Sequence, residues 1–335
     1  MIISLRYIIK RVIRYLLTLI IASTVVFIIP RLVPGDPIQC MVMRLMQQGQ
    51  VIQGADKLVK EYRRMFGLDG PLHVQYICYL KNLLRGNLGL SIMAFPATVQ
   101  ELIRARLPWT IGLLTNCVII SWVLGNILGA ILGWRASSKT SVIAAGLCLF
   151  FSQIPYYILA IILSLIFVYY IPLFPSGGGY SMGVTPGLNL TFIIDVLWHS
   201  TLPALSIILV SLGGWALGMR SMIVSVQGED FILFAEAKGL KRNVILMKYA
   251  LRNALLPQVT GLAMSLGFVV SGSMLTEYIF SYPGIGSLFI TAAGALDYNV
   301  LQGVLIIIIF CVLTANLIID LLYPLVDPRI HYERK

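Results

Sequence analysis

The sequence predicts an all-α polytopic membrane protein, and three observations support this fold class. Of the 335 residues, 58% are hydrophobic and only 12% are charged, whereas about a quarter of the residues in soluble domains are charged. Six apolar runs are long enough to form the helix of about 20 residues that crosses a bilayer. Lysine and arginine gather in some of the links between these runs and are absent from others, which is the pattern that fixes membrane topology.

The six expected transmembrane helices are apolar stretches flanked by polar or basic residues. They are expected at Val12–Arg31, Trp109–Trp134, Val142–Ile171, Thr201–Met219, Gln258–Ile279 and Leu301–Leu325. The chain is therefore expected to divide into an N-terminus with the first helix (1–31), a long loop (32–108), helices two to six (109–325) and a tail (326–335).

The first apolar run follows a basic head that contains Arg6, Lys10, Arg11 and Arg14. A secretory signal peptide has a similar head, but this run is too long. The sequence after it, Pro-Arg-Leu-Val-Pro-Gly-Asp-Pro, is also no small-residue cleavage site. We expect a retained signal anchor with its N-terminus in the cytoplasm.

Loop charges predict the orientation of the remaining helices. The links Arg135–Lys139 and Arg220–Arg252 are basic, as is the tail, whereas Pro172–Ser200 and Phe280–Val300 contain no lysine or arginine. Six helices with both termini in the cytoplasm place every short basic link inside, as expected of a multi-pass membrane protein. The net charge of +11 is then a topology signal, and nucleic-acid binding is not needed to explain it.

The long loop 32–108 is also basic, but long loops cross the membrane largely regardless of charge. Apolar residues at helical spacing predict one helix over Ala55–Phe66 that stops at Gly67, and a second that begins at Pro71 and ends at Gly86. The loop is therefore expected to form a helical extracytoplasmic subdomain between the first two transmembrane helices.

Five cysteines in a chain of this length do not make a disulfide scaffold. Cys117, Cys148 and Cys311 lie in apolar runs, where free cysteine behaves as a small hydrophobe. Cys40 and Cys78 both fall in the outer loop, where an oxidising compartment permits a bond. Nothing in the sequence fixes their separation, so both the bond and two free thiols stay open.

The third apolar run is interrupted at Gln153-Ile154-Pro155. Proline removes a backbone donor, so we expect a kink there. Such a kink either lies near a substrate path or is one of the prolines that are common in transmembrane helices.

The segment Phe231–Pro257 is the longest polar-containing stretch between two apolar runs in the second half of the chain. Small residues at Ala235, Ala237 and Gly239 permit close approach to the backbone, and Gly239 can end a short helix with a positive φ. We expect a short cytoplasmic helix with Ala235 and Ala237 on the surface that a soluble partner approaches. The alternative is an ordinary basic loop.

The run AEAKGL within this segment, followed by ALRNALLP, resembles the EAA motif of ATP-binding cassette (ABC) importer permeases, and most closely the oligopeptide/dipeptide/nickel group. The resemblance extends over nearly the whole chain, through PGDP at Pro34–Pro37, FGLDGPLHVQY at Phe66–Tyr76 and LRGNLGLS at Leu84–Ser91. One departure is that Leu233 and Phe234 stand where the general motif has its glutamate and first alanine.

The resemblance implies a type I ABC importer permease fold and a binding-protein-dependent transport system in the plasma membrane, the inner membrane of a bacterial or archaeal cell. This chain would form half of a translocation path for di- or oligopeptides and pair with a homologous second permease. Two cytoplasmic ABC ATPase subunits would provide energy, and an extracytoplasmic solute-binding protein would deliver substrate, docking on the outer loop unless that loop only caps the helix ends. Oligosaccharides and nickel chelates remain alternative substrates. Within the coupling loop 220–257, the residues expected to couple to the ATPases are Phe231, Ala235, Glu236, Ala237, Lys238, Gly239, Leu240, Leu256 and Pro257.

Ionisable residues inside apolar runs are functional candidates by default. Asp320 lies four residues after Asn316, on one helix face, and Glu277 lies near the outer end of the fifth run. Each is expected either to line the translocation path or to bond a neighbouring helix.

Catalytic motifs are absent from the sequence. It contains no Gly-x-x-x-x-Gly-Lys-[Ser/Thr], and His73, His199 and His331 are scattered, so we expect no ATP site, no catalytic residue, no cofactor and no metal site. An ion-coupled secondary transporter that uses Asp320 and Glu277 as a proton relay is a rival, but it leaves the basic cytoplasmic segment without a purpose. An intramembrane enzyme is a second rival.

Overall fold

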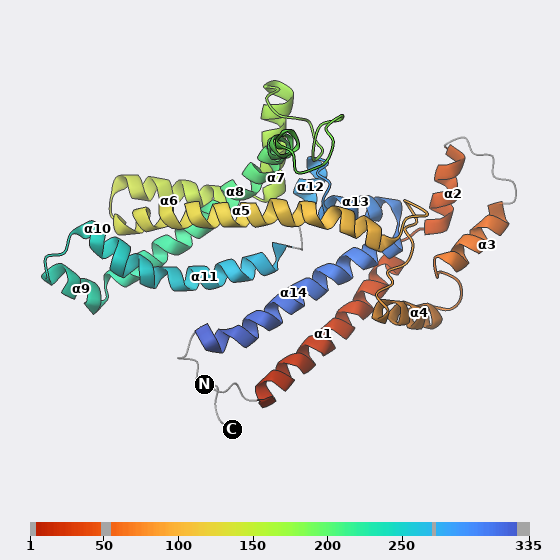
Figure 1. Cartoon of the computed structure of the whole chain (residues 1–335), viewed down its shortest axis with the longest axis horizontal. Helices are drawn as coiled ribbons and strands as arrows, with labels where there is room; N and C mark the ends of the chain where they lie inside the picture. Colours follow the sequence, from red (N-terminus) through yellow and green to blue (C-terminus); the bar gives the residue numbers. More distant parts are fainter. Residues whose placement is uncertain (1–4, 48–54, 270–272, 327–335) are drawn as a thin grey trace. The chain divides into compact units, whose positions relative to one another are not determined.

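The computed structural model describes residues 5–47, 55–269 and 273–326, and in these the regular elements are helices (Figure 1). The chain divides into two compact units. The first unit comprises Met1–Thr110, Val270–Met274 and Pro283–Lys335, and the second comprises Ile111–Val269 and Leu275–Tyr282. The tail residues Arg329, Arg334 and Lys335, and His331, lie outside the described residues.

The helices of the first unit are α1 (Leu5–Leu32), α2 (Pro37–Gln47), α3 (Ala55–Met65), α4 (Leu72–Leu84), the start of α5 (Val99–Trp134), α13 (Ile285–Ala295) and α14 (Tyr298–Val326). The second unit contains the rest of α5 with α6 (Lys139–Ser152), α7 (Tyr156–Ser164), α8 (Leu190–Gln227), α9 (Asp230–Ala237), α10 (Arg242–Ile245), α11 (Leu251–Gly267) and nearly all of α12 (Met274–Ile279). Two π-helical stretches, Leu165–Tyr170 and Leu246–Ala250, follow α7 and α10.

Among the described residues, four helices are long and apolar enough to cross a membrane: α1, α5, α8 and α14. The pair α6 and α7 makes a fifth if it is counted as one span, bent by 93°, so the kink predicted at Pro155 is confirmed. The all-helical membrane class is confirmed as well. The predicted span Gln258–Ile279 is divided between α11, with 17 residues, and α12, with 6, and residues 270–272 between them are not described. The count of six stays a prediction.

Two of the spanning helices begin well before their apolar runs because side chains cap them. At the start of α5, Thr98 and Glu101 form a reciprocal capping box: the Glu101 carboxylate accepts from the Thr98 N–H at 3.0 Å, and the Thr98 hydroxyl accepts from the Glu101 N–H at 3.2 Å. Asn189 caps α8 by accepting from the Phe192 N–H at 2.7 Å. The expected apolar runs therefore located the later part of each helix and missed its first turns.

The core of the first unit joins α5, α13 and α14. Its buried residues include Val99, Ile103, Ile285, Leu288, Ala292, Val300 and Val304. The helix α14, which contributes to this core, also lies side by side with α1 (Figure 1).

Asp297, just before α14, is a buried carboxylate with several donors. One oxygen accepts from the Ser91 hydroxyl at 2.7 Å and from the N–H groups of Ile92 and Met93 at 2.7 and 2.9 Å. The other accepts from the Val300 N–H at 3.1 Å and so caps the helix. Asp297 thereby fixes the turn that precedes α5 to the start of α14.

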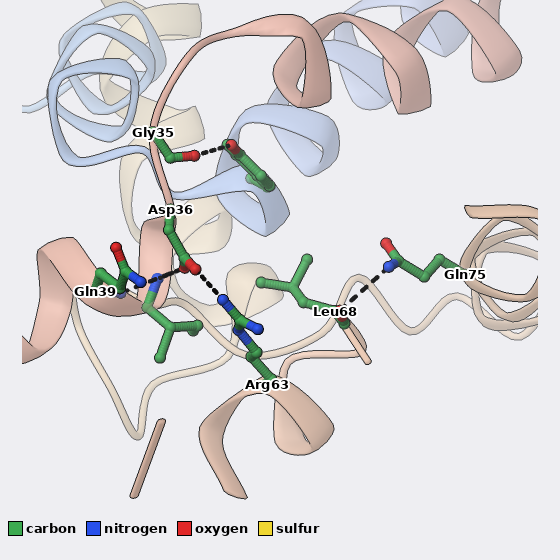
Figure 2. Close-up of polar contacts among 8 residues, drawn as sticks. Gly35, Asp36, Gln39, Arg63, Leu68 and Gln75 are labelled. Carbon is green, nitrogen blue, oxygen red and sulfur yellow. Dashed lines mark hydrogen bonds and ion pairs between the residues drawn. The ribbon is translucent and has the colours of Figure 1, made fainter. Parts of the chain in front are cut away.

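The predicted helices of the loop 32–108 are present as α3 and α4. Gly67 and Gly86 both follow with φ +70°, the left-handed conformation that glycine adopts without strain. Asp36 pairs with Arg63 of α3 and accepts from the Gln39 N–H at 3.3 Å (Figure 2). Partial burial would raise the pKa of Asp36, but these bonds outweigh it and hold that pKa below the ordinary value. Cys40 and Cys78 are both free thiols.

In the second unit, glycines bring α5 and α8 into backbone contact. A Cβ added at Gly129 would lie 2.3 Å from the Ala216 carbonyl oxygen, and one at Gly125 would lie 2.5 Å from the Trp215 Cβ. Gly133 is nearly as close, with its added Cβ 2.8 Å from the Ile223 Cβ. Three glycines at intervals of four form one helix face, so the two helices pack without side chains between them.

Candidate functional site

The candidate coupling segment begins where α8 ends and consists of the short helix α9 and the turn after it. This turn is a Schellman motif: the Gly239 N–H donates to the Glu236 carbonyl at 2.8 Å, and the Leu240 N–H donates to the Ala235 carbonyl at 3.4 Å. Gly239 has φ +72°. The predicted short helix that ends at Gly239 is therefore confirmed, and its role in coupling stays a prediction.

The inner face of α9 packs against its own chain. Ile232 and Ala235 are buried, with Ala235 only 3% exposed, in a core that includes Ile223, Ile245 and Ala250. The prediction that placed Ala235 on the approach surface is wrong, because its small side chain lets α9 pack against α8 and the helix that follows. Periodicity could have shown this, since Ile232 and Ala235 are three residues apart.

The outer face of α9 is exposed and largely aromatic or apolar. The side chains of Phe234 and Leu233 are 69% and 54% exposed, and Phe231 is exposed as well. The other predicted coupling residues at the end of the helix are also exposed: Glu236, Ala237, Lys238 and Gly239. Leu240 is half-buried.

Leu256 and Pro257 lie within α11, where both are exposed. Their predicted position, closing a loop before the next apolar run, is wrong. The chain is helical without a gap from Arg242 through α10, the π-helical stretch and α11. Pro257 leaves the Asn253 carbonyl without its intrahelical donor, but the flanking turns continue.

Asp320 joins α14 to α1. Its carboxylate accepts from the Arg11 guanidinium at 2.5 Å, and its backbone carbonyl accepts from the Tyr7 hydroxyl at 3.1 Å. Six residues earlier in α14, the Thr314 hydroxyl lies 3.1 Å from the Tyr15 hydroxyl of α1. Of the two roles expected for Asp320, the bond to a neighbouring helix is present, and lining of the path stays a prediction.

Asn316 lies on α14 with its side chain half-buried. Glu277 of α12 is wholly buried in the second unit, where its carbonyl accepts from the Tyr282 N–H at 2.8 Å. The Tyr282 hydroxyl in turn bonds the Ser200 hydroxyl at 3.1 Å. The structure thus does not bring Asp320 and Glu277 together in one unit.

Within the described part of the chain, no group of three or more histidine, cysteine, aspartate or glutamate side chains could hold a metal ion. His199 bonds the Asp195 carbonyl of its own helix at 2.9 Å, and His73 is exposed on α4.

Two structural features were missed by the sequence reasoning. The glycines at 125, 129 and 133 carry a readable signal, because Gly-x-x-x-Gly in an apolar run marks a close helix contact. Asp297 carries none, since its main partner Ser91 is 206 residues away along the chain.

Two family models match the chain. Residues 125–332 match the binding-protein-dependent transport system inner membrane component, and residues 4–114 match the N-terminal part of such membrane components.

Curated relatives match over almost their full length. The chain is 34% identical to the oligopeptide transport system permease protein AppB of Bacillus subtilis, over 97% of this chain and 99% of that protein. It is equally, 34%, identical to a putative peptide permease protein of Brucella ovis over 97% of this chain and 99% of that one. It is 32% identical to the probable D,D-dipeptide transport system permease protein DdpB of Escherichia coli over 94% of each.

Proposed function

This chain belongs to the family of binding-protein-dependent transport system inner membrane components, and from that premise we propose that it is a permease subunit of an ATP-driven importer of di- or oligopeptides. The printed names of its relatives, which include oligopeptide, peptide and D,D-dipeptide permeases, support this substrate class. The chain itself does no covalent chemistry in this proposal. It forms half of the translocation path, and a homologous second permease forms the other half.

The observation that carries the coupling role is the outer face of α9. The charges of Asp230, Glu236 and Lys238 support a position of this short helix in water, because charged groups are costly in hydrocarbon. The exposed Phe234 and Leu233 would then face water unless a protein covers them. We propose that one of the two cytoplasmic ABC ATPase subunits covers these side chains.

Movement of the ATPase would reach the membrane through α8. Only Gly228 and Glu229 separate α8 from α9, and Ala235 fixes α9 in the core of the second unit. A push on α9 therefore acts on a packed helix rather than on a loose loop, as alternating access requires.

The coupling test compares two glycines in matched surroundings. Gly239 and Gly67 have φ +72° and +70°, and a Cβ at either would meet nothing within 4 Å. Valine at either position should cost about 1–2 kcal/mol of backbone strain and leave membrane insertion intact. We expect Gly239→Val, and not Gly67→Val, to release the ATPase subunits or to uncouple ATP hydrolysis from uptake.

A second variant tests the surface without backbone strain. Phe234→Ala removes an exposed ring, so the chain should fold and pair normally while co-purified ATPase falls. Asn243→Ala, exposed beyond the Schellman turn, is its control. If Gly239→Val and Phe234→Ala both keep parental ATPase retention and peptide uptake, the coupling role is refuted.

Orientation and substrate need separate measurements. With both termini in the cytoplasm, a cysteine at Tyr180 should react with an impermeant reagent from outside and one at Asn243 only from inside. The reverse pattern would put α9 on the outer side of the membrane, where no cytoplasmic ATPase can bind it.

The assembled complex should take up labelled peptides in preference to nickel chelates or oligosaccharides. The opposite preference would overturn the proposed substrate class and leave the coupling role untouched.

A further inference from the structure

We propose that α4 is an interfacial helix: it lies along the membrane–water boundary at the C-terminal end of α1, with its exposed face against phospholipid. No residue of α4 is buried. A helix that belongs to an ordered subdomain yet buries none of its residues requires an explanation of what contacts its free side.

Apart from Leu72 in the first turn, the exposed residues of α4 form one continuous face. Val74, Ile77 and Leu84 are exposed apolar residues at helical spacing, and Ile77 and Leu84 have exposed fractions of 49% and 89%. Lys81 and Arg85 are exposed on the same face. From Leu72 to Arg85 the sequence contains no aspartate or glutamate.

The opposite face of α4 is attached to the last two turns of α1. The Tyr76 hydroxyl lies 2.7 Å from the Thr24 hydroxyl, and the Tyr76 ring packs edge-on against Phe27 with centroids 5.2 Å apart. The Arg31 guanidinium donates to the Gln75 side-chain oxygen at 3.2 Å. Figure 2 shows that Gln75 also donates to the Leu68 carbonyl, which ties α4 to the turn before it.

This attachment sets the depth of α4 in the membrane. The spanning part of α1, Tyr7–Leu32, has 26 residues and is therefore about 39 Å long, against a hydrocarbon core of about 30 Å. Thr24 lies about 12 Å before the end of α1. If the surplus of about 9 Å is shared equally, about 4.5 Å of α1 lies outside the hydrocarbon at each end. Arg31 then lies among the headgroups, and Thr24 and Phe27 lie within about 8 Å inside the acyl chains. The contacts that hold α4 therefore straddle the boundary, at the depth of an interfacial helix.

The exposed face of α4 lies beside an exposed apolar surface of α1 that is expected to face lipid. On α1, Val25, Ile28 and Ile29 are exposed at the same level as the residues that hold α4. An apolar stripe with basic residues and no acidic ones is what an interfacial helix presents to phosphate headgroups. The stems of Lys81 and Arg85 can lie along the apolar region while their charges reach those phosphates.

The test uses the native Cys78, which is exposed on α4 between Ile77 and Lys81. The full chain, with its other four cysteines replaced, carries a spin label at Cys78 in lipid nanodiscs that contain phosphatidylglycerol and phosphatidylcholine. Collision rates are measured with oxygen, which partitions into lipid, and with a water-soluble nickel chelate. The control label replaces Lys60, which is exposed on α3.

We expect the ratio of oxygen to nickel collisions to be several-fold higher at Cys78 than at the Lys60 position. Lys81→Gln with Arg85→Gln should lower the local preference for phosphatidylglycerol by about fivefold per charge removed. Equal ratios at the two labels would place α4 in water and overturn the proposal. Low collision rates with both reagents, in the chain alone or in the assembled complex, would show that a protein covers the face and would overturn it too.

Discussion

Replacing Gly129 should separate α5 from α8, and the effect can be worked from the contact distances. A Cβ at this position would lie 2.3 Å from the Ala216 carbonyl oxygen and 2.8 Å from the Met219 Cβ. Ordinary contacts of a Cβ begin roughly 1 Å further out, at about the 3.5 Å optimum for non-bonded atoms. The obstacle is backbone, which cannot rotate away as a long side chain can. Even alanine therefore forces the two helices apart by about 1 Å at their closest point.

Overpacking of this kind costs about 1–3 kcal/mol for alanine, and valine should cost more. The assay is the thermal unfolding of the purified chain in detergent, together with its abundance in the membrane. Gly112 of the same helix is the control, because a Cβ there meets nothing within 4 Å, and Gly112→Ala should be neutral or slightly stabilising since alanine favours the helix. If Gly129→Ala unfolds at the same temperature as Gly112→Ala, the close backbone contact is refuted.

Three further predictions concern carboxylates. Asp297→Ala should leave several buried donors unpaired and expose residues 91–93 to rapid hydrogen exchange, and Asp297→Asn should have a milder effect. Unchanged exchange would show that Asp297 does not fix this turn to α14. Asp320→Asn should lower the amount of assembled complex modestly, as expected of a half-exposed pair with Arg11, while uptake per complex is kept; uptake lost from an intact complex would instead show that Asp320 lines the path. Because the folded-state pKa of Asp36 is depressed, its stabilisation of α2 against α3 is complete above the unfolded pKa of about 4 and is lost only as pH falls through the lower, folded value. Hydrogen exchange in α3 should therefore rise only in strong acid, and Arg63→Gln should reduce this dependence.

The features that the sequence predicted are those that short stretches of chain determine. The break at Pro155 and the positive φ of Gly67 and Gly239 follow from the chemistry of single residues. The apolar runs likewise located four of the spanning helices.

The features that could not be predicted from the sequence depend on contacts between residues far apart along the chain. Arg11 and Asp320 are 309 residues apart, so no local pattern joins them, and the role of Asp320 stayed open between two alternatives. Ala235 was misassigned for a related reason. A small residue allows close packing either of another protein or of the same chain. At Ala235 it is the same chain that packs, because Ile245 and Ala250 lie in the same buried core.

The bend between α6 and α7 has a consequence for hydration. With 14 residues, α6 is about 21 Å long, too short to cross the hydrocarbon by itself. At the bend, the first N–H groups of α7, on Tyr156 and Tyr157, have no acceptor within that helix, and Gln153 is exposed beside them. Lipid tails offer no hydrogen bonds, so a break at membrane depth is stable only where water or another protein reaches it. We therefore expect the surface around Gln153 to face a wet cavity or a partner chain, and not the bilayer.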